Sequence, residues 1–265
     1  MHTTSFLVTG AAGGIGRALC RGLLERGHAV TATDLDGPRL AEAQQALAAG
    51  NRSRLLVSAL DVTDLAQFRR VVAEAIATFG PLGGLINNAG IMSSAPFAEV
   101  DTALWQRVID VNLLGVVHGC RAAVEVMVPQ GHGHIVNVAS TAGIAPVLNA
   151  APYVATKHAV VGLTNTLREE LRGANVHVHL AVPGLIDTGI FDRSLDRGGL
   201  SSRAMAEHAP IAKLSPARAA AAIIRGIERN RSQITFPLVN RVLVGAYRWF
   251  PRLTTRAIIT SQRGH

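Results

Sequence analysis

The sequence predicts an α/β fold in which a doubly wound parallel sheet is covered by helices on both faces. Short apolar runs alternate with segments of about ten to twenty residues that carry apolar side chains at helical spacing. Because a crossover between two parallel strands must pass over a face of the sheet, this alternation implies that both faces are buried. The chain has 265 residues, 48% of them hydrophobic and 17% charged, which is enough for one large core.

The predicted elements follow one another in a regular order along the chain. An apolar run at 5–9 breaks into glycines at 10–16, and apolar side chains then recur at helical spacing until Gly27 ends the helix. Further strands are predicted at 28–33, 54–60, 84–87, 134–138 and 175–182, and further helices at 38–48, 64–79, 102–128 and 153–171. No linker rich in Pro, Gly or Ser divides the chain. We therefore predict one Rossmann-type domain over residues 1–237, with residues 238–265 as its basic C-terminal extension.

The net charge of +8 is concentrated in the C-terminal part of the chain. Residues 1–210 contain 16 basic and 17 acidic side chains, whereas residues 211–265 contain ten basic and one acidic. Only two of the 26 basic residues are lysines, so compositional bias explains the charge as readily as a binding patch does. We do not expect a nucleic-acid partner.

Other sequence features argue against a membrane-spanning, disulfide-bonded or metal-binding protein. No uninterrupted apolar run approaches about 18 residues, and the first ten residues show no leader, so we expect a soluble cytoplasmic protein. Cys20 and Cys120 lie in no CxxC motif and are expected in the core. His177 and His179 alternate on a predicted strand without a third evident ligand, so no metal site is expected.

The glycine-rich stretch after the first strand has the features of a phosphate-binding loop. Gly10, Gly14 and Gly16 let the backbone approach a pyrophosphate, and the unpaired N–H groups at the helix start favour negative charge. Asp34, at the end of the next strand, can accept hydrogen bonds from ribose hydroxyls but repels a 2′-phosphate. We therefore predict NAD rather than NADP, a preference that either of the nearby Arg17 and Arg39 would weaken. Two alternatives stay open: a glycine turn without a ligand, and an aspartate that only caps the next turn.

A tyrosine, a lysine and a serine form the candidate reacting group. Tyr153 and Lys157 are four positions apart in a helical stretch, so their side chains lie on one face. Ser140 lies just beyond the predicted strand 134–138, where a parallel sheet presents its ligand crevice. A neighbouring ammonium group favours the phenolate and lowers the tyrosine pKa from its ordinary value of about 10. Alone, a Tyr/Lys pair at this spacing is better explained by a solvated helix face.

Taken together, these motifs occur in an order that resembles the short-chain dehydrogenase/reductase family, over about residues 4–235. The matching positions are Thr9-Gly10-Ala11-Ala12-Gly13-Gly14-Ile15-Gly16, Asn87-Asn88-Ala89-Gly90, Asn112, Ser140, Tyr153 with Lys157, and Pro183-Gly184. The resemblance implies an enzyme, an NAD(P)-dependent oxidoreductase, with a catalytic tetrad of Asn112, Ser140, Tyr153 and Lys157.

The same resemblance implies a role for each residue. Tyr153 would be the general base or acid for the alcohol or ketone oxygen, and Ser140 would hydrogen-bond that oxygen. Lys157 would lower the tyrosine pKa and position the nicotinamide ribose. Asn112 would hold a water that links the lysine to solvent; the alternative is a polar residue that only bends the helix. The residues implied to bind the cofactor are Gly10, Gly14, Ile15, Gly16, Asp34, Asp61, Val62, Asn88, Ala89, Gly90, Tyr153, Lys157, Pro183, Gly184, Ile186 and Thr188.

Apolar side chains dominate the segments that this family varies around the substrate. They are Ile91, Met92, Ile144, Val147, Leu148, Leu185, Ile190, Phe191, Leu195, Leu200 and Met205. They favour a hydrophobic secondary alcohol or ketone over a sugar phosphate, although each could equally be a core or subunit contact. The glycine-containing loop 188–210 is expected to be a mobile lid. We predict hydride transfer between NAD(H) and such a substrate; the alternative is a non-catalytic dinucleotide-sensing protein that binds a partner or membrane through its basic tail.

The C-terminal extension and the long helices bear on larger assemblies. Helical spacing gathers Arg241, Arg248, Arg252 and Arg256 on one side, with Pro251 interrupting the helix. Contact of this segment with a membrane surface or a lipophilic pocket is one interpretation, and packing on its own or a neighbouring subunit is the other. By the family resemblance we expect a homodimer or homotetramer that pairs the helices 102–128 and 153–171, where the small residues Ala155, Ala159 and Gly162 would allow close contact.

Overall fold

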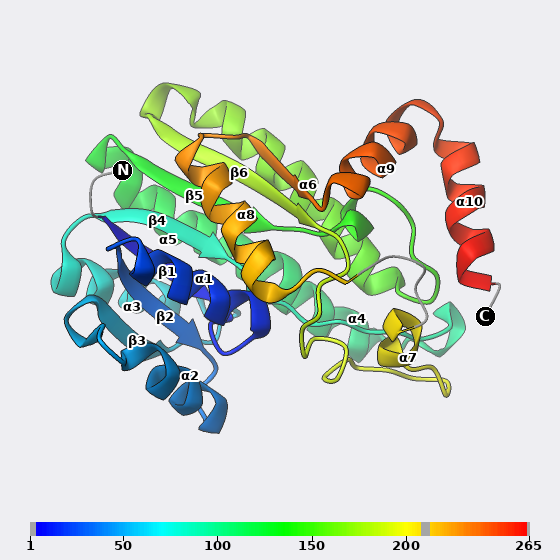
Figure 1. Ribbon diagram of the computed structural model, residues 1–265, viewed down its shortest axis with the longest axis horizontal. Coiled ribbons are helices and arrows are strands. Elements are labelled where there is room, and N and C mark those ends of the chain that lie inside the picture. Colours follow the sequence, from blue (N-terminus) through cyan, green and yellow to red (C-terminus); the bar gives the residue numbers. More distant parts are fainter. Residues whose placement is uncertain (1–3, 208–212, 264–265) are drawn as a thin grey trace.

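A seven-stranded parallel sheet runs through the molecule (Figure 1). The computed structural model describes residues 4–207 and 213–263. The strands are β1 Ser5–Thr9, β2 Ala29–Asp34, β3 Leu55–Ala59, β4 Leu82–Asn87, β5 Gly133–Val138, β6 Val176–Pro183 and β7 Gln233–Phe236. They lie in the order β3-β2-β1-β4-β5-β6-β7, and every pair is parallel. The predicted doubly wound parallel sheet is confirmed.

Helices cover both faces of this sheet (Figure 1). They are α1 Gly14–Glu25, α2 Pro38–Ala48, α3 Leu65–Phe79, α4 Thr102–Ile109, α5 Gly115–Gln130, α6 Ala151–Glu170, α7 Ser202–Glu207, α8 Pro216–Glu228, α9 Leu238–Trp249 and α10 Pro251–Arg263. Side chains of β1 alternate between two cores: Phe6 and Val8 pack with residues of α1 and α8, and Leu7 packs with residues of α3 and α5. Burial on both sides explains why the strand is apolar throughout.

The central strand β1 marks the point where the chain changes its winding direction. It pairs with β2 on one side and with β4 on the other. In such a sheet the connections leave in opposite directions, and a crevice opens at the carboxyl ends of the strands. Thr9, Asn87, Val138 and Pro183 end β1, β4, β5 and β6 at this edge. The residues that follow them are therefore brought to one place.

Two parts of the fold differ from the sequence prediction. The single helix expected at 102–128 is divided into α4 and α5 by a π-helical turn, Asp110–Leu114. The turn forms where Asn112, fully buried, bonds the backbone of Ile91 instead of facing solvent. The sequence analysis did not predict β7 and α8, which complete the far edge of the sheet. The four residues of β7 are too few for a clear strand pattern.

Residues 102–130 form the one described helical stretch that is long and apolar enough to cross a membrane by length and composition alone. Its α5 part packs on α3, β4 and β5 inside the domain. Cys20 and Cys120 are both buried, as expected.

His177 and His179 have a third histidine beside them, contrary to the sequence analysis. Nδ1 of His134 lies 3.0 Å from Nε2 of His179, and its ring stacks on both neighbours. Burial and the neighbouring histidines lower the pKa of His134 to about 4, and burial lowers that of His179 to about 4. Within the described residues, no group of three or more His, Cys, Asp or Glu side chains could hold a metal ion. His134 and His179 are therefore neutral at neutral pH.

Candidate active site

The glycine-rich loop joins β1 to α1 at the carboxyl edge of the sheet. Gly10 has φ +69°, a left-handed conformation that glycine adopts readily. A Cβ on Gly16 would lie 2.0 Å from the backbone oxygen of Gly10, so only glycine fits there. Gly13 precedes α1 without a side-chain cap, and the first turn has no acidic residue. The first N–H groups of α1 therefore have no side-chain partner from the cap, which is the arrangement that binds an anion.

Thr9 and Asn88 connect this loop to the turn after β4. Oγ1 of Thr9 accepts hydrogen bonds from the backbone nitrogens of Asn88 and Ala89, both at 3.0 Å. In return, Nδ2 of Asn88 donates to the backbone oxygen of Thr9 at 2.9 Å. These bonds hold the two turns side by side, with Ala89 and Gly90 on the cavity wall.

Asp34, at the end of β2, is fixed by the backbone around it. One carboxylate oxygen accepts from the nitrogen of Ala12 and the other from that of Leu35, both at 2.9 Å. Two arginines lie close to this carboxylate. Arg39 donates to the backbone oxygen of Ala12. The pKa of Arg193 is lowered, chiefly by burial and also by the charge of Arg39, and the carboxylate of Asp34 only partly offsets this shift. The sequence analysis considered Arg39 but missed Arg193, because a loop 159 positions from Asp34 gives no local signal.

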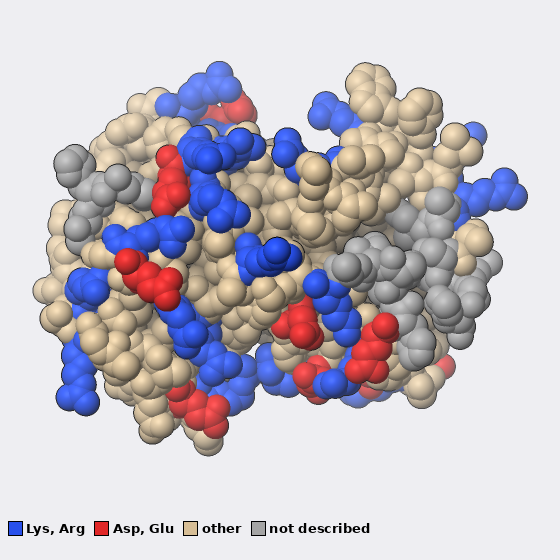
Figure 2. Space-filling model, in the orientation of Figure 1, with Lys and Arg blue, Asp and Glu red and all other residues tan. Residues whose placement is uncertain are grey.

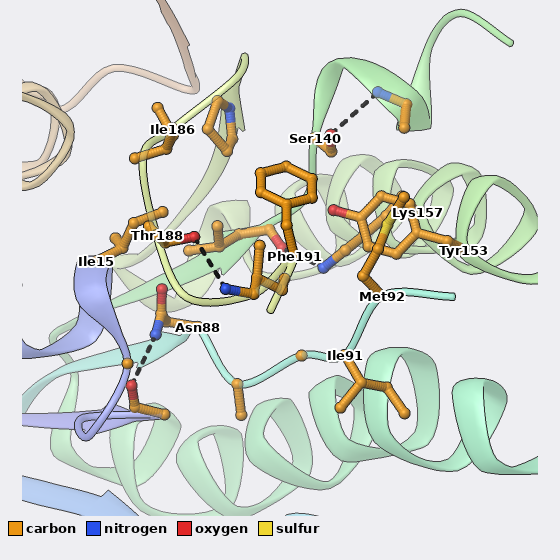
Figure 3. A pocket seen from close by; sticks show the side chains of 18 of the residues that line it. Ile15, Asn88, Ile91, Met92, Ser140, Tyr153, Lys157, Ile186, Thr188 and Phe191 are labelled. Atoms are coloured by element: carbon orange, nitrogen blue, oxygen red, sulfur yellow. Dashed lines mark hydrogen bonds between the residues drawn. The ribbon is translucent and has the colours of Figure 1, made fainter. Parts of the chain in front are cut away.

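Ser140, Tyr153 and Lys157 meet at the other end of the cavity (Figure 3). Ser140 follows β5 and accepts a hydrogen bond from the nitrogen of Ala142 at 3.1 Å, which fixes its rotamer. Tyr153 and Lys157 lie one turn apart near the start of α6, and a side-chain hydrogen bond links Tyr153 to Ser140. Nζ of Lys157 donates to the backbone oxygen of Val138 at 2.9 Å and lies 5.7 Å from the centre of the Tyr153 ring. The convergence expected from the sequence is present.

The tyrosine pKa moves in the opposite direction to the one predicted from the sequence. Burial raises the pKa of Tyr153, and the hydrogen bond from Ser140 only partly offsets it. Burial also lowers the pKa of Lys157 to about 8. Desolvation disfavours the charged form of each group, so burial acts against the phenolate and the tyrosine pKa is not lowered below its ordinary value. A pKa above the ordinary value leaves the Tyr153 hydroxyl protonated at neutral pH.

Asn112 lies beneath the site, in the π-helical turn between α4 and α5. Its side chain accepts from the nitrogen of Ile91 at 2.8 Å and donates to the oxygen of the same residue at 2.9 Å. It also lies 3.4 Å from Oγ1 of Thr156, on the helix of the tyrosine and lysine. Asn112 is outside the cavity lining, whereas every other predicted site residue lines it. It positions the segment after β4 against α6.

One cavity of about 1030 Å³ joins the glycine loop to the serine, tyrosine and lysine. Figure 3 shows Ile15, Asn88 and Thr188 at one end and Ser140, Tyr153 and Lys157 at the other. The expected apolar residues that line it are Ile91, Met92, Val147, Leu185, Ile190 and Phe191; Ile144, Leu148, Leu195 and Leu200 do not, and the side chain of Met205 lies outside the described part. Asn240 and Leu243 of α9 also line the cavity; the sequence analysis missed Asn240, whereas Leu243 belongs to the segment for which contact with a lipophilic pocket was one interpretation.

The loop expected to be a lid is bonded to the segment after β4. The backbone nitrogens of Leu195 and Arg197 donate to the oxygens of Met92 and Ser94, both at 2.9 Å. Asp196 accepts from Ser194 and from the nitrogen of Ser202, so one carboxylate organises this part of the loop. Residues 208–210 of the expected lid lie outside the described residues.

Comparison with known proteins identifies the family. The family model for short chain dehydrogenase matches residues 4–197, and the chain belongs to this family. The 3-alpha-(or 20-beta)-hydroxysteroid dehydrogenase of Mycobacterium bovis is 38% identical over 186 residues, which are 70% of this chain and 70% of that protein. The chain is therefore similar to oxidoreductases in sequence.

Solved structures support the same family assignment. A short chain dehydrogenase/reductase from Burkholderia phymatum in complex with NAD aligns with a TM-score of 0.86 and 29% identity, covering 95% of each chain. A variant actinorhodin polyketide ketoreductase with NADPH aligns with a TM-score of 0.78 and 29% identity, over 88% of this chain and 94% of that one. The neighbours thus include both an NAD complex and an NADPH complex. The recognition made from the sequence motifs is confirmed.

Proposed function

We propose that this short-chain dehydrogenase transfers a hydride between NAD(H) and a hydrophobic secondary alcohol or ketone. The observation that carries this proposal is one continuous cavity with an anion-binding loop at one end and Ser140, Tyr153 and Lys157 at the other. A binding protein that only senses a dinucleotide has no need for this second group of residues. Burial brings the pKa of the lysine to about 8, close to neutral pH, as a proton relay requires, and keeps the tyrosine protonated.

The loop residues fit a dinucleotide. Gly10 and Gly16 leave the backbone bare where a pyrophosphate would lie, and the nitrogens of Gly14 and Ile15 would bind it at the start of α1. Asp61 and Val62 line the cavity and would contact the adenine, while Pro183, Gly184, Ile186 and Thr188 line it and would border the nicotinamide. When bound, the nicotinamide would supply or accept the hydride.

Proton transfer would fall to the residues at the far end of the cavity. Tyr153 would donate its hydroxyl proton to the ketone oxygen and become a phenolate; in the reverse direction this phenolate would accept the proton of the alcohol. Ser140 orients the same oxygen, since its own rotamer is fixed by the nitrogen of Ala142. Lys157, with its pKa near 8, returns a proton toward the tyrosine side, and its carbonyl partner Val138 holds it in place.

The preference for NAD over NADP rests on Asp34. Its carboxylate is held by two backbone nitrogens and faces the cavity, so a 2′-phosphate there would meet a fixed negative charge. Arg39 and Arg193 line the same part of the cavity and reduce this repulsion. The proposal is therefore a preference, measured as a ratio of kcat/KM values, in favour of NAD.

The substrate class rests on the apolar lining around the reacting group. Met92 and Phe191 lie beside Tyr153 in Figure 3, and Val147 and Leu185 also line the cavity. An apolar wall with a few fixed polar groups favours a large hydrophobic carbonyl compound over a phosphorylated one. The relative from Mycobacterium bovis, named for hydroxysteroids, supports a substrate of this kind.

Oxidation of NADH and NADPH in the presence of apolar ketones, including cyclic ones, tests the proposal. We expect turnover with NADH and a lower kcat/KM with NADPH. Turnover that is restricted to phosphorylated carbonyl compounds would contradict the substrate class. Tight NADH binding without turnover of any carbonyl compound would favour the dinucleotide-sensing alternative.

We also propose a homodimer or homotetramer formed through α6 and the α4–α5 pair. Ala155 and Gly162 are exposed on α6, and small residues allow a second helix to approach closely. Sedimentation velocity tests this proposal. A Gly162→Arg variant is expected to form a smaller assembly, with a lower sedimentation coefficient than the wild type, and an unchanged coefficient would contradict the proposal.

A further inference from the structure

The helices α9 and α10 form a surface that the catalytic proposal does not use. They follow β7 and lie beyond the residues that match the family model. In Figure 1 they stand at one end of the molecule, with α10 projecting beyond the layers that sandwich the sheet. The large exposed apolar side chains of this segment are Leu238, Val239, Val242, Trp249, Phe250 and Leu253. Soluble domains rarely concentrate so many in one short segment.

The two faces of α9 have different environments. Asn240 and Leu243 point inward and line the catalytic cavity. At about 100° per residue, the exposed Leu238, Val242 and Trp249 fall within about 40° of one another on the opposite face. The apolar residues on this outer face contact no core, so the packing of the domain does not account for them.

Positive charge accompanies the apolar stripe. Arg241 and Arg248 lie along one flank of it on α9, and Arg252 and Arg256 are exposed on α10. Residues 238–265 contain five arginines and no aspartate or glutamate. Among the described residues, the ion pairs do not involve these four arginines. In Figure 2 the upper right of the molecule, where α9 and α10 lie, shows tan and blue atoms, and the visible carboxylates lie elsewhere.

We propose that the outer face of α9 and the start of α10 dock on the surface of an anionic lipid bilayer. Exposed aromatic residues such as Trp249 and Phe250 favour the boundary between headgroups and acyl chains, and flanking arginines bind anionic headgroups. A second copy of this chain is a poorer occupant. A two-fold interface pairs a patch with itself, and this patch would set arginines against arginines with no carboxylate of its own to balance them.

Docking in this way would bring the cavity to the lipid. Leu243 lines the cavity from the same helix that carries Trp249 on its outer face. One helix therefore separates the cavity from the bilayer surface. The binding proposal itself does not depend on catalysis, so it is tested with the protein alone and stands or falls separately from the proposed function.

Trp249 serves as the reporter in the test. The chain has two tryptophans, so a full-length Trp105→Phe background leaves a single fluorophore, 78% exposed, at the proposed contact. We expect its emission to shift to shorter wavelength with vesicles of phosphatidylglycerol and phosphatidylcholine, and brominated lipid to quench it. We expect little change with phosphatidylcholine alone, and weaker binding at high salt because screening weakens the arginine contacts.

Matched variants, measured by vesicle co-sedimentation, distinguish binding through this surface from nonspecific binding to vesicles. Each arginine at an anionic surface contributes about a fivefold factor to binding, so Arg241→Gln, Arg248→Gln and Arg252→Gln together should weaken it about 100-fold. Trp249→Ser should also weaken it. The first control is the triple variant Arg21→Gln, Arg52→Gln and Arg70→Gln, which removes the same charge from exposed positions elsewhere. The second control is Phe97→Ser, which removes an aromatic residue that is 72% exposed.

The controls should bind vesicles as the wild type does. Absence of binding to anionic vesicles, or an equal loss in control and test variants, would overturn the proposal. So would a vesicle-free dimer that Trp249→Ser dissociates, because the surface would then belong to self-association. The circular dichroism spectrum and the urea unfolding midpoint of Trp249→Ser without vesicles should match those of the wild type, which confirms that the variant is folded.

Discussion

The burial of Lys157 predicts that the stability of the protein depends on pH, which can be measured without substrate or cofactor. The folded protein holds this lysine almost fully buried, with its pKa lowered by burial from 10.5 to about 8. In the unfolded chain the pKa returns to its ordinary value. Between these two values the unfolded state binds more protons than the folded state, so the free energy of unfolding rises with pH. Replacing the lysine by methionine removes this dependence while filling a similar volume.

The size of the effect follows from the two pKa values. For pKa values of about 8 folded and 10.5 unfolded, raising the pH from about 7.5 to about 9.5 adds about 2 kcal/mol to the stability. The buried thiols act in the opposite direction, since burial raises the pKa of Cys20 to about 12 and that of Cys120 to about 11. They are present in both proteins, so the difference between wild type and Lys157→Met isolates the lysine.

Urea unfolding of both proteins across this pH range measures the difference. We expect the wild type to gain about 2 kcal/mol relative to Lys157→Met as the pH rises. Parallel pH profiles, or a wild type that loses stability relative to the variant, would refute the reasoning. That result would mean that the buried lysine keeps an ordinary pKa, and the proposed proton donor would lack its poised neighbour.

Three further predictions concern the cofactor loop and the histidine cluster. Gly16→Ala should weaken NADH binding at least about 100-fold in calorimetry, because the backbone must shift to admit the methyl group. Gly173→Ala is the control, since open space surrounds Gly173 and this variant should bind NADH as the wild type does. Equal affinities of the two variants would contradict the loop assignment. Asp34→Ser should lower kcat/KM for NADH about tenfold and raise it for NADPH, and an unchanged ratio would count against the role of this carboxylate. Stability should fall by about 3 kcal/mol from about pH 7 to about pH 5, because His134 and His179, with pKa values of about 4, must be neutral in the folded state; His134→Gln should show a shallower fall in the same urea titration.

Much of the fold was predictable because its signals are local. The glycines at 10–16, the apolar runs and the residues around Asp34 each lie within a short window, and the helix Pro38–Ala48 is bounded as predicted. The π-helical turn at Asn112 was not predictable, because it depends on hydrogen bonds to Ile91, a residue 21 positions away. The strand β7 was missed because it gains its stability from pairing with β6 rather than from its own short sequence.

The candidate site was predictable in its residues but less so in its energetics. Spacing places Tyr153 and Lys157 on one face of a helix, and the structure places Ser140 beside them. The sequence could not show how far the two side chains are removed from solvent, and this desolvation reverses the expected shift in the tyrosine pKa. Arg193 and Leu243 reach the cavity from distant segments and carry no motif.

The central claim is that the hydroxyl of Tyr153 transfers the proton, and the chain offers a matched control because it has one other tyrosine, Tyr247. Single-turnover reduction of an apolar ketone, with NADH binding measured in parallel, compares Tyr153→Phe with Tyr247→Phe. We predict that Tyr153→Phe lowers the rate of the chemical step by about 10²- to 10⁴-fold while NADH still binds, and that Tyr247→Phe leaves the rate unchanged. A Tyr153→Phe protein that reduces the ketone at the wild-type rate would contradict the account.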